Sequence, residues 1–506
     1  MQEIDDGLEG EQSEELQSAD EEVKEHRGTP LAAKECDALD ALEEAGKCHL
    51  IKTNITEKYK FPIGFIVDGI HVVELYLRDH VKLEELPNAI GNLAFLQILK
   101  IDEENLTVFP DSMARLTSLV YLKLRSRALT SLPDVITRLK SLRSLDLGSN
   151  VFTSLPESLE NLDSLVSFSL HGNKLTTFPD VITRLKPLET LDLEAVKITS
   201  LPDSIDQLQS LQKLDLSYIG PITLPETFRN LIALRELDLG HNGLTSFPSA
   251  ICDLPNLEIL SVRENGLRSL PEFIGNLATL RRLDLNNNDL TLLPDTIGTL
   301  KALETLDIAN NDLIHFPDSL GELSALQFLT AYDNKLQVLP ETIGSLVSLK
   351  ILELQDNQLS DLPGTLDQLS SLQTLALDAN DFSTLPDVVT RMPWLYNLSL
   401  DNNHITVIPD AIGNLVRLDH LSVESNGLAI LPEQIGELKV LKKLKLRGNP
   451  SLCLSEEMLS WTKELEKRAR DQVLIINGPP PPRRRSRWHF LNGVYTLFMD
   501  PKPGIP

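Results

Sequence analysis

The chain has 506 residues, 74 acidic against 47 basic, and a formal net charge of -27. This acidic balance argues against nonspecific nucleic-acid binding, which needs cation clusters to neutralise phosphates. The first residues carry neither a basic segment nor an apolar run, and no stretch approaches the ~18 apolar residues of a membrane span. With only four, widely spaced cysteines, we expect reduced thiols and an intracellular, cytoplasmic protein.

The segment before the main body divides into two predicted parts. Residues 1–30 are acidic, polar and poor in aromatics, which predicts a disordered tail. Residues 31–73 are predicted to form an N-terminal helix and cap. Ala32–Lys47 has apolar residues at helical spacing, and Ile51–Val73 is dense enough in apolar side chains to cover the open end of a repeat stack.

Residues 74–450 are organised by a repeat of 23 residues. The stretch LRRLDLNNNDLTLLP at Leu280–Pro294 is restated in the next 23 residues, and sixteen prolines from Pro87 to Pro432 keep one register without insertion or deletion. A period of about 20–29 residues that carries L-x-x-L-x-L-x-x-N-x-L is the signature of leucine-rich repeats. The sequence therefore predicts an α/β leucine-rich-repeat solenoid of about seventeen repeats.

Each repeat has a framework part and a variable part. Leu280, Leu283 and Leu285 are predicted to point inward from a short strand, and the residues between them to point to the opposite face. Stacked repeats would pair these strands into a parallel sheet on a concave face, with short helical or irregular segments on the convex side. Asn288 would turn the chain out of the strand by bonding to backbone groups.

The Asn position is interrupted in four repeats, where Glu104, Arg127, Val196 and Ile219 stand instead. Because the adjacent pair Val196 and Ile219 cannot supply an amide, we expect a local break in the Asn ladder. Two interpretations remain open at this point: a tolerated defect, or a change in curvature beside a partner site.

No catalytic or metal-binding motif occurs in the chain. The P-loop, the G-x-S-x-G nucleophile elbow, H-E-x-x-H and C-x-x-C are all missing, and the ten histidines are scattered. We therefore predict a protein that is not an enzyme and that uses no cofactor and no metal.

The concave positions between the framework leucines are free to vary, and six of them are aspartates: Asp146, Asp192, Asp215, Asp238, Asp284 and Asp307. Adjacent strands are about 4.8 Å apart, so Asp192, Asp215 and Asp238 are predicted to form a ladder of like charges. Such a ladder repels itself unless it is solvated or matched by a cationic partner. The alternative is that Asp is simply a frequent residue at this position of leucine-rich repeats and has no role in binding.

The same face is predicted to be basic at both ends. Its start carries Lys100, Lys123, Arg125 and Arg127, and its end carries Lys443, Lys445 and Arg447. Phe328 and Tyr332 are predicted to lie outward on one strand beside acidic residues, a composition typical of protein-binding hot spots. Single exposed aromatics are also ordinary surface residues.

The C-terminal part is predicted to contain a cap and a tail. Residues 451–477 should form a capping helix that starts at Ser455 and packs Met458, Leu459, Trp461 and Leu465 on the last repeat. Residues 478–506 form a Pro/Arg/aromatic tail. Pro479, Pro482 and Arg484 fit the pattern that SH3 domains bind, and the arginines and aromatics also suit an anionic membrane surface. The alternative is a disordered tail that rests on the acidic body.

The repeat L-P-x-x-I-G-x-L-x-x-L-x-x-L-x-L-x-x-N-x-L resembles the intracellular Ras-scaffold class of leucine-rich repeats. That class includes the Shoc-type scaffolds, Scribble/Erbin proteins and plant intracellular Ras-group-related proteins. The resemblance implies a non-enzymatic scaffold in signalling whose concave face binds a small GTPase, kinase or phosphatase. The chain departs from Scribble/Erbin in lacking their C-terminal domain. The alternative function is a microbial effector or regulatory subunit that modulates a GTPase, a phosphatase or a ubiquitin ligase.

Overall fold

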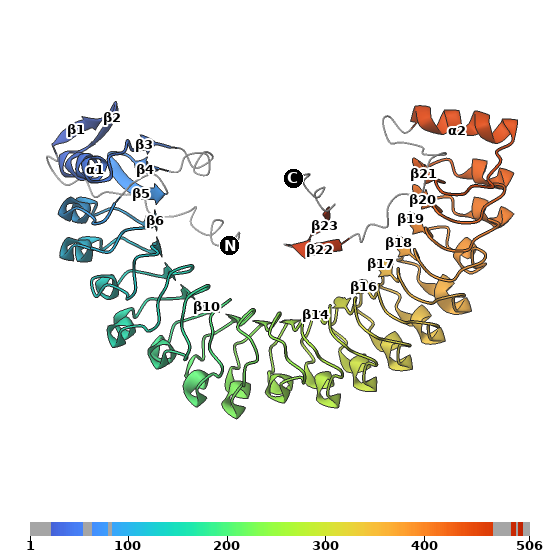
Figure 1. The fold of residues 1–506 in the computed structure, drawn as a ribbon, viewed down its shortest axis with the longest axis horizontal. Helices are drawn as coiled ribbons and strands as arrows, with labels where there is room; N and C mark the ends of the chain where they lie inside the picture. Colours follow the sequence, from blue (N-terminus) through green and yellow to red (C-terminus); the bar gives the residue numbers. More distant parts are fainter. Residues whose placement is uncertain (1–21, 54–62, 79–82, 469–486, 492–493, 499–506) are drawn as a thin grey trace. The chain divides into compact units, whose positions relative to one another are not determined.

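The computed structural model describes residues 22–53, 63–78, 83–468, 487–491 and 494–498. The chain forms two compact units, Met1–Ile219 and Gly220–Pro506. In both units short strands line one side of each repeat and 3-10 turns lie on the other (Figure 1). We call the side that the strands form the strand face of that unit.

The first unit begins with a hairpin where the sequence predicts disorder. β1 (Val23–His26) pairs antiparallel with β2 (Thr29–Ala32). The predicted disordered tail of residues 1–30 is therefore wrong over its last eight residues, and its first 21 residues lie outside the described part. The hairpin is stable because Leu31 and Ala32 are buried. The acidic composition of the whole segment predicts disorder, but two buried apolar side chains are enough to fix the hairpin.

A helix and a small sheet follow the hairpin. α1 (Ala33–Gly46) buries Ala38, Leu39 and Leu42, and ends where Lys47 adopts a left-handed conformation. β3 (Ile51–Lys52) pairs parallel with β4 (Gly64–Asp68), which runs antiparallel to β5 (His71–Arg78). The buried Glu35 of α1 accepts a hydrogen bond from the Val72 backbone N–H at 2.7 Å. This bond holds the helix against the first repeat strand.

The repeats of the first unit form a parallel sheet. From β5 onward the strands pair in register with their successors: β6 (Ile98–Asp102), β7 (Tyr121–Arg125), β8 (Ser144–Asp146), β9 (Ser167–Ser169), β10 (Thr190–Asp192) and β11 (Lys213–Asp215). The 3-10 turns between them are Asn88–Asn92, Asp111–Arg115, Ile136–Arg138, Glu157–Asn161, Asp180–Arg184 and Asp203–Gln207.

The repeats of the second unit follow the same plan. Its parallel strands are β12 (Glu236–Asp238), β13 (Ile259–Ser261), β14 (Arg282–Asp284), β15 (Thr305–Asp307), β16 (Phe328–Thr330), β17 (Ile351–Glu353), β18 (Thr374–Ala376), β19 (Asn397–Ser399), β20 (His420–Ser422) and β21 (Lys443–Lys445). Its 3-10 turns are Glu226–Asn230, Ser249–Asp253, Glu272–Asn276, Asp295–Thr299, Asp318–Glu322, Glu341–Ser345, Gly364–Gln368, Val389–Arg391, Asp410–Asn414 and Glu433–Glu437.

Counted over the described residues, β5 to β21 make seventeen repeat strands, and the predicted leucine-rich-repeat solenoid is confirmed. The convex segments are 3-10 turns for a local reason. Pro294 is extended, with φ -71 and ψ 151, and its carbonyl accepts the Ile297 N–H at 3.0 Å, an i to i+3 bond. Leu300 must then return inward, so only five residues remain for the turn, too few for a stable α-helix.

The framework residues are buried as predicted. Leu280, Leu283 and Leu285 are fully buried. Asn288 Nδ2 donates to the carbonyls of Val262 and Leu285, and its Oδ1 accepts the Leu267 N–H at 3.1 Å. The amide thus ties one repeat to the preceding one. At the positions of Val196 and Ile219, both buried and apolar, this amide is missing. Ile219 is also the last residue of the first unit.

The second unit ends in a helix and a separate hairpin. α2 (Glu456–Arg468) starts where the sequence places it, because Ser455 Oγ accepts the Met458 N–H at 3.2 Å. Met458 and Leu465 are buried, but Leu459 is 44% exposed, so its predicted packing on the last repeat is wrong. The reason is its position one residue round the helix from Met458, away from the buried side.

β22 (Arg487–Leu491) and β23 (Val494–Phe498) pair antiparallel within the predicted tail. Pro479, Pro482 and Arg484, the candidate SH3 motif, lie outside the described residues. Across the part of the chain that is described, no helix is both long and apolar enough to cross a membrane. Cys36, Cys48, Cys252 and Cys453 are free thiols.

Candidate protein-binding surface

The predicted aspartates of the first unit already have partners on its strand face. Asp146 forms an ion pair with Lys123 at 2.7 Å and accepts the Gly148 N–H. Asp215 accepts hydrogen bonds from the backbone N–H and the hydroxyl of Ser217. Asp192 lies opposite Asp215 on the adjacent strand, as the ladder predicts. Asp238, the third member of the predicted ladder, belongs to the second unit.

Asp192 is stabilised as a charged group by its neighbours. Burial opposes ionisation, but hydrogen bonds from His171, from the Glu194 N–H and from Ser169 outweigh it and lower the pKa of Asp192. The same Asp192 hydrogen bond raises the pKa of His171, against the opposing effect of burial. Gly148 leaves room for this imidazole, since a Cβ there would overlap the ring. Each of these two groups therefore favours the charged form of the other.

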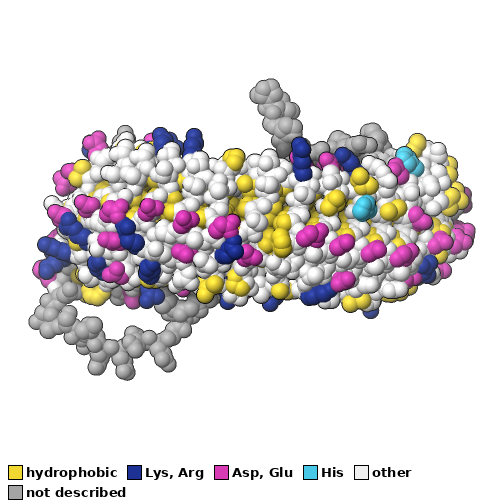
Figure 2. Space-filling model, turned by 90° about the horizontal axis from the view of Figure 1, so that it is seen from below, with side chains coloured by type: hydrophobic (Ala, Val, Ile, Leu, Met, Phe, Trp, Pro, Cys, Tyr) yellow, Lys and Arg dark blue, Asp and Glu magenta, His cyan; other side chains and the backbone are white. Residues whose placement is uncertain are grey.

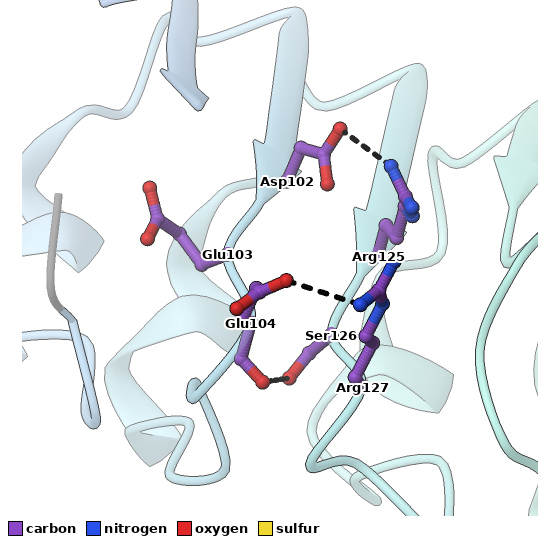
Figure 3. A pocket seen from close by; sticks show the side chains of 6 residues that line it. All are labelled: Asp102, Glu103, Glu104, Arg125, Ser126 and Arg127. Atoms are coloured by element: carbon purple, nitrogen blue, oxygen red, sulfur yellow. Dashed lines mark hydrogen bonds and ion pairs between the residues drawn. The ribbon is translucent and has the colours of Figure 1, made fainter. Parts of the chain in front are cut away.

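At the basic start of the strand face, Lys123, Arg125 and Arg127 form ion pairs within the first unit, and Lys100 lies over the rings of Tyr76 and Tyr121. Arg125 pairs with Asp102 at 3.2 Å and Arg127 pairs with Glu104 at 3.3 Å, as Figure 3 shows for a shallow pocket at this place. Ser126 Oγ donates to backbone carbonyls in the same pocket. All six lining side chains are charged or polar. Such a lining does not suit a small organic ligand, whose pockets are mostly apolar.

In the second unit, the predicted aspartates Asp284 and Asp307 lie opposite each other on the paired strands β14 and β15. Burial and the charge of Asp307 raise the pKa of Asp284 to about 7. Burial also raises the pKa of Asp307 to about 6, although hydrogen bonds from the Ala309 N–H and from Asn286 oppose the shift. Arg263 favours the charged form of both carboxyls without offsetting burial. Burial therefore makes ionisation of this pair costly, and the groups around it do not offset that cost.

The predicted aromatic pair is half-buried on the same face. Phe328 is the first residue of β16. Tyr332 lies two residues beyond the strand, which ends at Thr330, so the two are not on one strand as predicted. Burial and then the charge of Asp307 raise the pKa of the Tyr332 hydroxyl, which keeps it a hydrogen-bond donor.

Four further acidic residues extend this surface and were missed in the sequence: Glu353, Asp378, Asp401 and Glu424. Burial raises the pKa of Glu353 to about 7. Burial and the charge of Asp401 raise the pKa of Asp378 to about 7. Asp378, Asp401 and Glu424 stand two residues after the ends of β18, β19 and β20, in one column with a 23-residue spacing. The 23-residue spacing of these acidic residues is a signal in the sequence, two positions beyond the one between the framework leucines.

The predicted basic end of the second unit lies beside this column. Lys443 and Lys445 are the outer residues of β21, which pairs with β20, and Arg447 follows two residues later. In contrast with Arg125 and Arg127, these three cations make no ion pair within 4.0 Å among the described residues. Burial, followed by the charge of Lys445, lowers the pKa of Lys443.

Sequence and structure comparisons agree on the family. The model of the leucine-rich repeat region matches residues 53–166, 112–197, 272–352 and 337–467, and a second leucine-rich-repeat model matches residues 224–267. The chain belongs to the leucine-rich-repeat family. No curated protein matches it significantly.

Solved structures of other leucine-rich-repeat proteins share the fold. A leucine-rich-repeat protein of Leptospira interrogans is 32% identical, with a TM-score of 0.65 over 83% of this chain and 99% of that one. The Drosophila Toll–Spatzle complex is 25% identical, with a TM-score of 0.66 over 77% of this chain and 55% of the other. An internalin, InlF of Listeria monocytogenes, is 22% identical, with a TM-score of 0.52 over 66% and 88%.

The outer side of this leucine-rich-repeat protein differs from the strand face. Figure 2 looks onto this side around β14, where apolar and acidic side chains are interspersed. Phe273, in the 3-10 turn Glu272–Asn276, is 65% exposed, and elsewhere in the repeats Val338 and Ile430 are 63% and 60% exposed. Scattered exposed apolar residues of this kind are ordinary on a protein surface.

One group of side chains in the described residues has the spacing of a metal site: His26, Asp40 and Glu43. Its carboxylates are already in use. Glu43 accepts hydrogen bonds from Arg27 and from the Leu50 N–H, and Asp40 lies 2.9 Å from His26 Nδ1. A bound cation would also face the Arg27 guanidinium. The group therefore fits a structural network of the N-terminal cap better than a metal centre.

Proposed function

We propose that this leucine-rich-repeat protein is a non-enzymatic scaffold whose second-unit strand face, β12 to β21, binds a partner protein. The observation that carries this proposal is the acidic surface of that face. Asp284, Asp307, Glu353, Asp378 and Asp401 are buried or half-buried carboxyls whose pKa values are all raised. Burial makes the charged form of these carboxyls costly, and cationic groups of a partner would lower that cost.

The leucine-rich-repeat fold supports the same proposal. Parallel strands hold successive side chains about 4.8 Å apart, so one partner segment can contact several repeats at once. The aromatic residues Phe328 and Tyr332 lie within the acidic surface and would supply contact area at its centre. The first unit is a weaker candidate, since Asp146 and Asp192 are matched internally.

The class of partner is proposed from similarity. The repeat resembles that of Ras scaffolds, which supports a small GTPase, a kinase or a phosphatase as partner, in intracellular signalling. The likeness to a Leptospira protein over 99% of its length supports the alternative, a microbial effector or regulatory subunit that acts on such an enzyme or on a ubiquitin ligase. Both functions use the fold for protein binding, and the identity of the partner separates them.

Site-specific photo-crosslinking tests the proposal. p-Benzoylphenylalanine replaces Phe328 on the strand face or, as a matched control, the exposed Phe273 on the outer side. We expect irradiation in the producing cells to yield a discrete adduct from position 328 and none of the same mass from position 273. Mass spectrometry of the adduct identifies the partner. Equal adducts from both positions, or none from position 328, would contradict binding at this face.

A further inference from the structure

The column of polar side chains along the end of the second unit changes sign between two adjacent repeats. Asp378, Asp401 and Glu424 are followed, at the same 23-residue spacing, by Arg447. The strands that precede them, β18 to β21, pair in register, so the four residues follow the ends of consecutive strands of one sheet. We call these four residues, together with Lys443 and Lys445, the charge boundary.

The first two carboxylates bond to the repeat that follows each of them. Asp378 Oδ1 accepts the Asp401 N–H at 2.7 Å and the Ser399 hydroxyl. Asp401 Oδ1 accepts the Glu424 N–H and the Ser422 hydroxyl, both at 2.6 Å. This ladder needs a serine at the last position of the next strand and a short acidic side chain.

The ladder stops at Glu424. The next strand carries Lys445 where a serine would be needed, and Glu is one methylene longer than Asp. The Glu424 residue is only 7% exposed, yet its carboxylate makes no hydrogen bond and no ion pair among the described residues. The Glu424 oxygens are not among the fully buried atoms that lack a partner, so the carboxylate reaches solvent and is open to a cationic group supplied from outside.

The basic side of the boundary shows the same lack of partners. Arg447 Nε is buried and has no hydrogen-bond partner in the described part of the chain. Neither Lys445, the last residue of the adjacent strand β21, nor Arg447, two residues beyond it, forms an ion pair within 4.0 Å of the Glu424 carboxylate. Further along the column, Gln355 Oε1 is also buried without a partner. Glu424 on the acidic side and Lys443, Lys445 and Arg447 on the basic side therefore form no ion pair among the described residues.

We propose that the charge boundary binds an extended partner segment with a basic block next to an acidic block. The basic block lies over Asp378, Asp401 and Glu424, and the acidic block lies over Lys443, Lys445 and Arg447. Charge complementarity selects this occupant: a wholly basic segment meets three cations at one end, and a wholly acidic one meets three carboxylates. This inference rests on the proposed function and specifies the partner chemistry.

Synthetic peptides test the inference with the full chain. Two fluorescent 12-residue peptides of equal composition are compared by anisotropy at physiological ionic strength, one with segregated Lys and Glu blocks and one with alternating Lys and Glu. We expect the segregated peptide to bind about tenfold tighter or better. Equal affinities would show nonspecific charge attraction, and no binding of the segregated peptide would also overturn the proposal.

Two variants locate the site. Glu424→Gln and Arg447→Gln remove charge from side chains that make no hydrogen bond within the described residues, so both variants should fold. Each should weaken the segregated peptide about tenfold. Glu194→Gln, at the same repeat position in the first unit, is the matched control and should leave affinity unchanged.

Unchanged affinity in Glu424→Gln and Arg447→Gln would reject the site. The crosslink at position 328 would still stand, so failure of this inference is distinguishable from failure of the proposed function.

Discussion

At the scale of single residues, Asp192 and Asp284 show how neighbours decide the chemistry of one repeat position. Both stand between the framework leucines of their strands. Asp192 receives bonds from His171 and Ser169, and its pKa is lowered. Asp284 faces Asp307 in the next strand, and burial with that like charge raises its pKa to about 7. The same residue type is therefore stabilising in the first unit and costly in the second.

These opposite shifts predict opposite pH dependences. With a folded pKa of about 7, above its ordinary 3.8, Asp284 binds a proton in the folded state that the unfolded state releases. Its contribution to the free energy of unfolding therefore falls as pH rises from about 4 to about 7. We expect Asp284→Asn to raise the free energy of unfolding by about 1–2 kcal/mol at pH 8 and to have little effect at pH 4.

Asp192→Asn is the matched comparison. Because the pKa of Asp192 is lowered, its contribution is present above the unfolded pKa and is lost as pH falls through the folded value. We expect this variant to lower the free energy of unfolding at pH 7, with the difference shrinking towards acid pH. Urea denaturation at pH 4, 6 and 8 measures both. A destabilising Asp284→Asn at pH 8 would contradict the assigned shift.

At the scale of the repeat, each Asn of the ladder connects its own repeat to the preceding one, as Asn288 does. A single amide such as that of Asn288 satisfies three buried backbone groups, two carbonyls and one N–H. The residue directly before it, Asn287, adopts a left-handed conformation with φ 54, and the corresponding residue does so in most repeats. The turn out of the strand is thus strained, and the amide holds it closed.

We expect Asn288→Ala to be strongly destabilising. It leaves the Val262 and Leu285 carbonyls and the Leu267 N–H without this partner in a buried place, at a cost of about 2–4 kcal/mol. Asn414→Ala, at an exposed site at the end of an outer turn, should change the free energy of unfolding by less than about 0.5 kcal/mol. Chemical denaturation of both variants is the measurement. Similar effects at both sites would refute the role given to the ladder.

At the scale of the whole molecule, the interrupted ladder and the division into units coincide. Val196 and Ile219 replace Asn in two consecutive repeats, and the first compact unit ends at Ile219. In a repeat protein, stability is a sum of the stabilities of the repeats and of their nearest-neighbour interfaces. Two consecutive repeats without the amide therefore contribute less to the stability of the chain than repeats that carry it, whatever the local curvature.

We expect calorimetry to resolve two unfolding transitions in the full chain. Leu191→Ala and Leu283→Ala each remove a fully buried framework side chain, one in each unit, at a cost of about 2–5 kcal/mol. Each variant should lower the midpoint of one transition and leave the other in place. A single transition that both variants shift equally would show that the chain unfolds as one cooperative body.

The repeat pattern is enough to predict the fold. A period of 23 residues with fixed leucines and prolines permits one packing solution, because each repeat buries its apolar face only against identical neighbours. The 3-10 turns and the cap at Ser455 follow from local chain length and hydrogen bonding. The hairpin at residues 23–32 did not follow, because a few buried side chains outweighed the acidic composition around them.

Only the tertiary structure decided which charges remain available on the strand face. In the sequence, Asp146, Asp192 and Asp284 are alike, as are Arg125 and Arg447. Contacts between repeats match Asp146 with Lys123 and Arg125 with Asp102, but they leave Glu424 without an ion pair among the described residues. The period places these side chains in columns, whereas the identity of the neighbour one strand away sets whether each charge is compensated. That pairing depends on distances of a few ångströms between residues 23 apart, which a linear pattern does not contain.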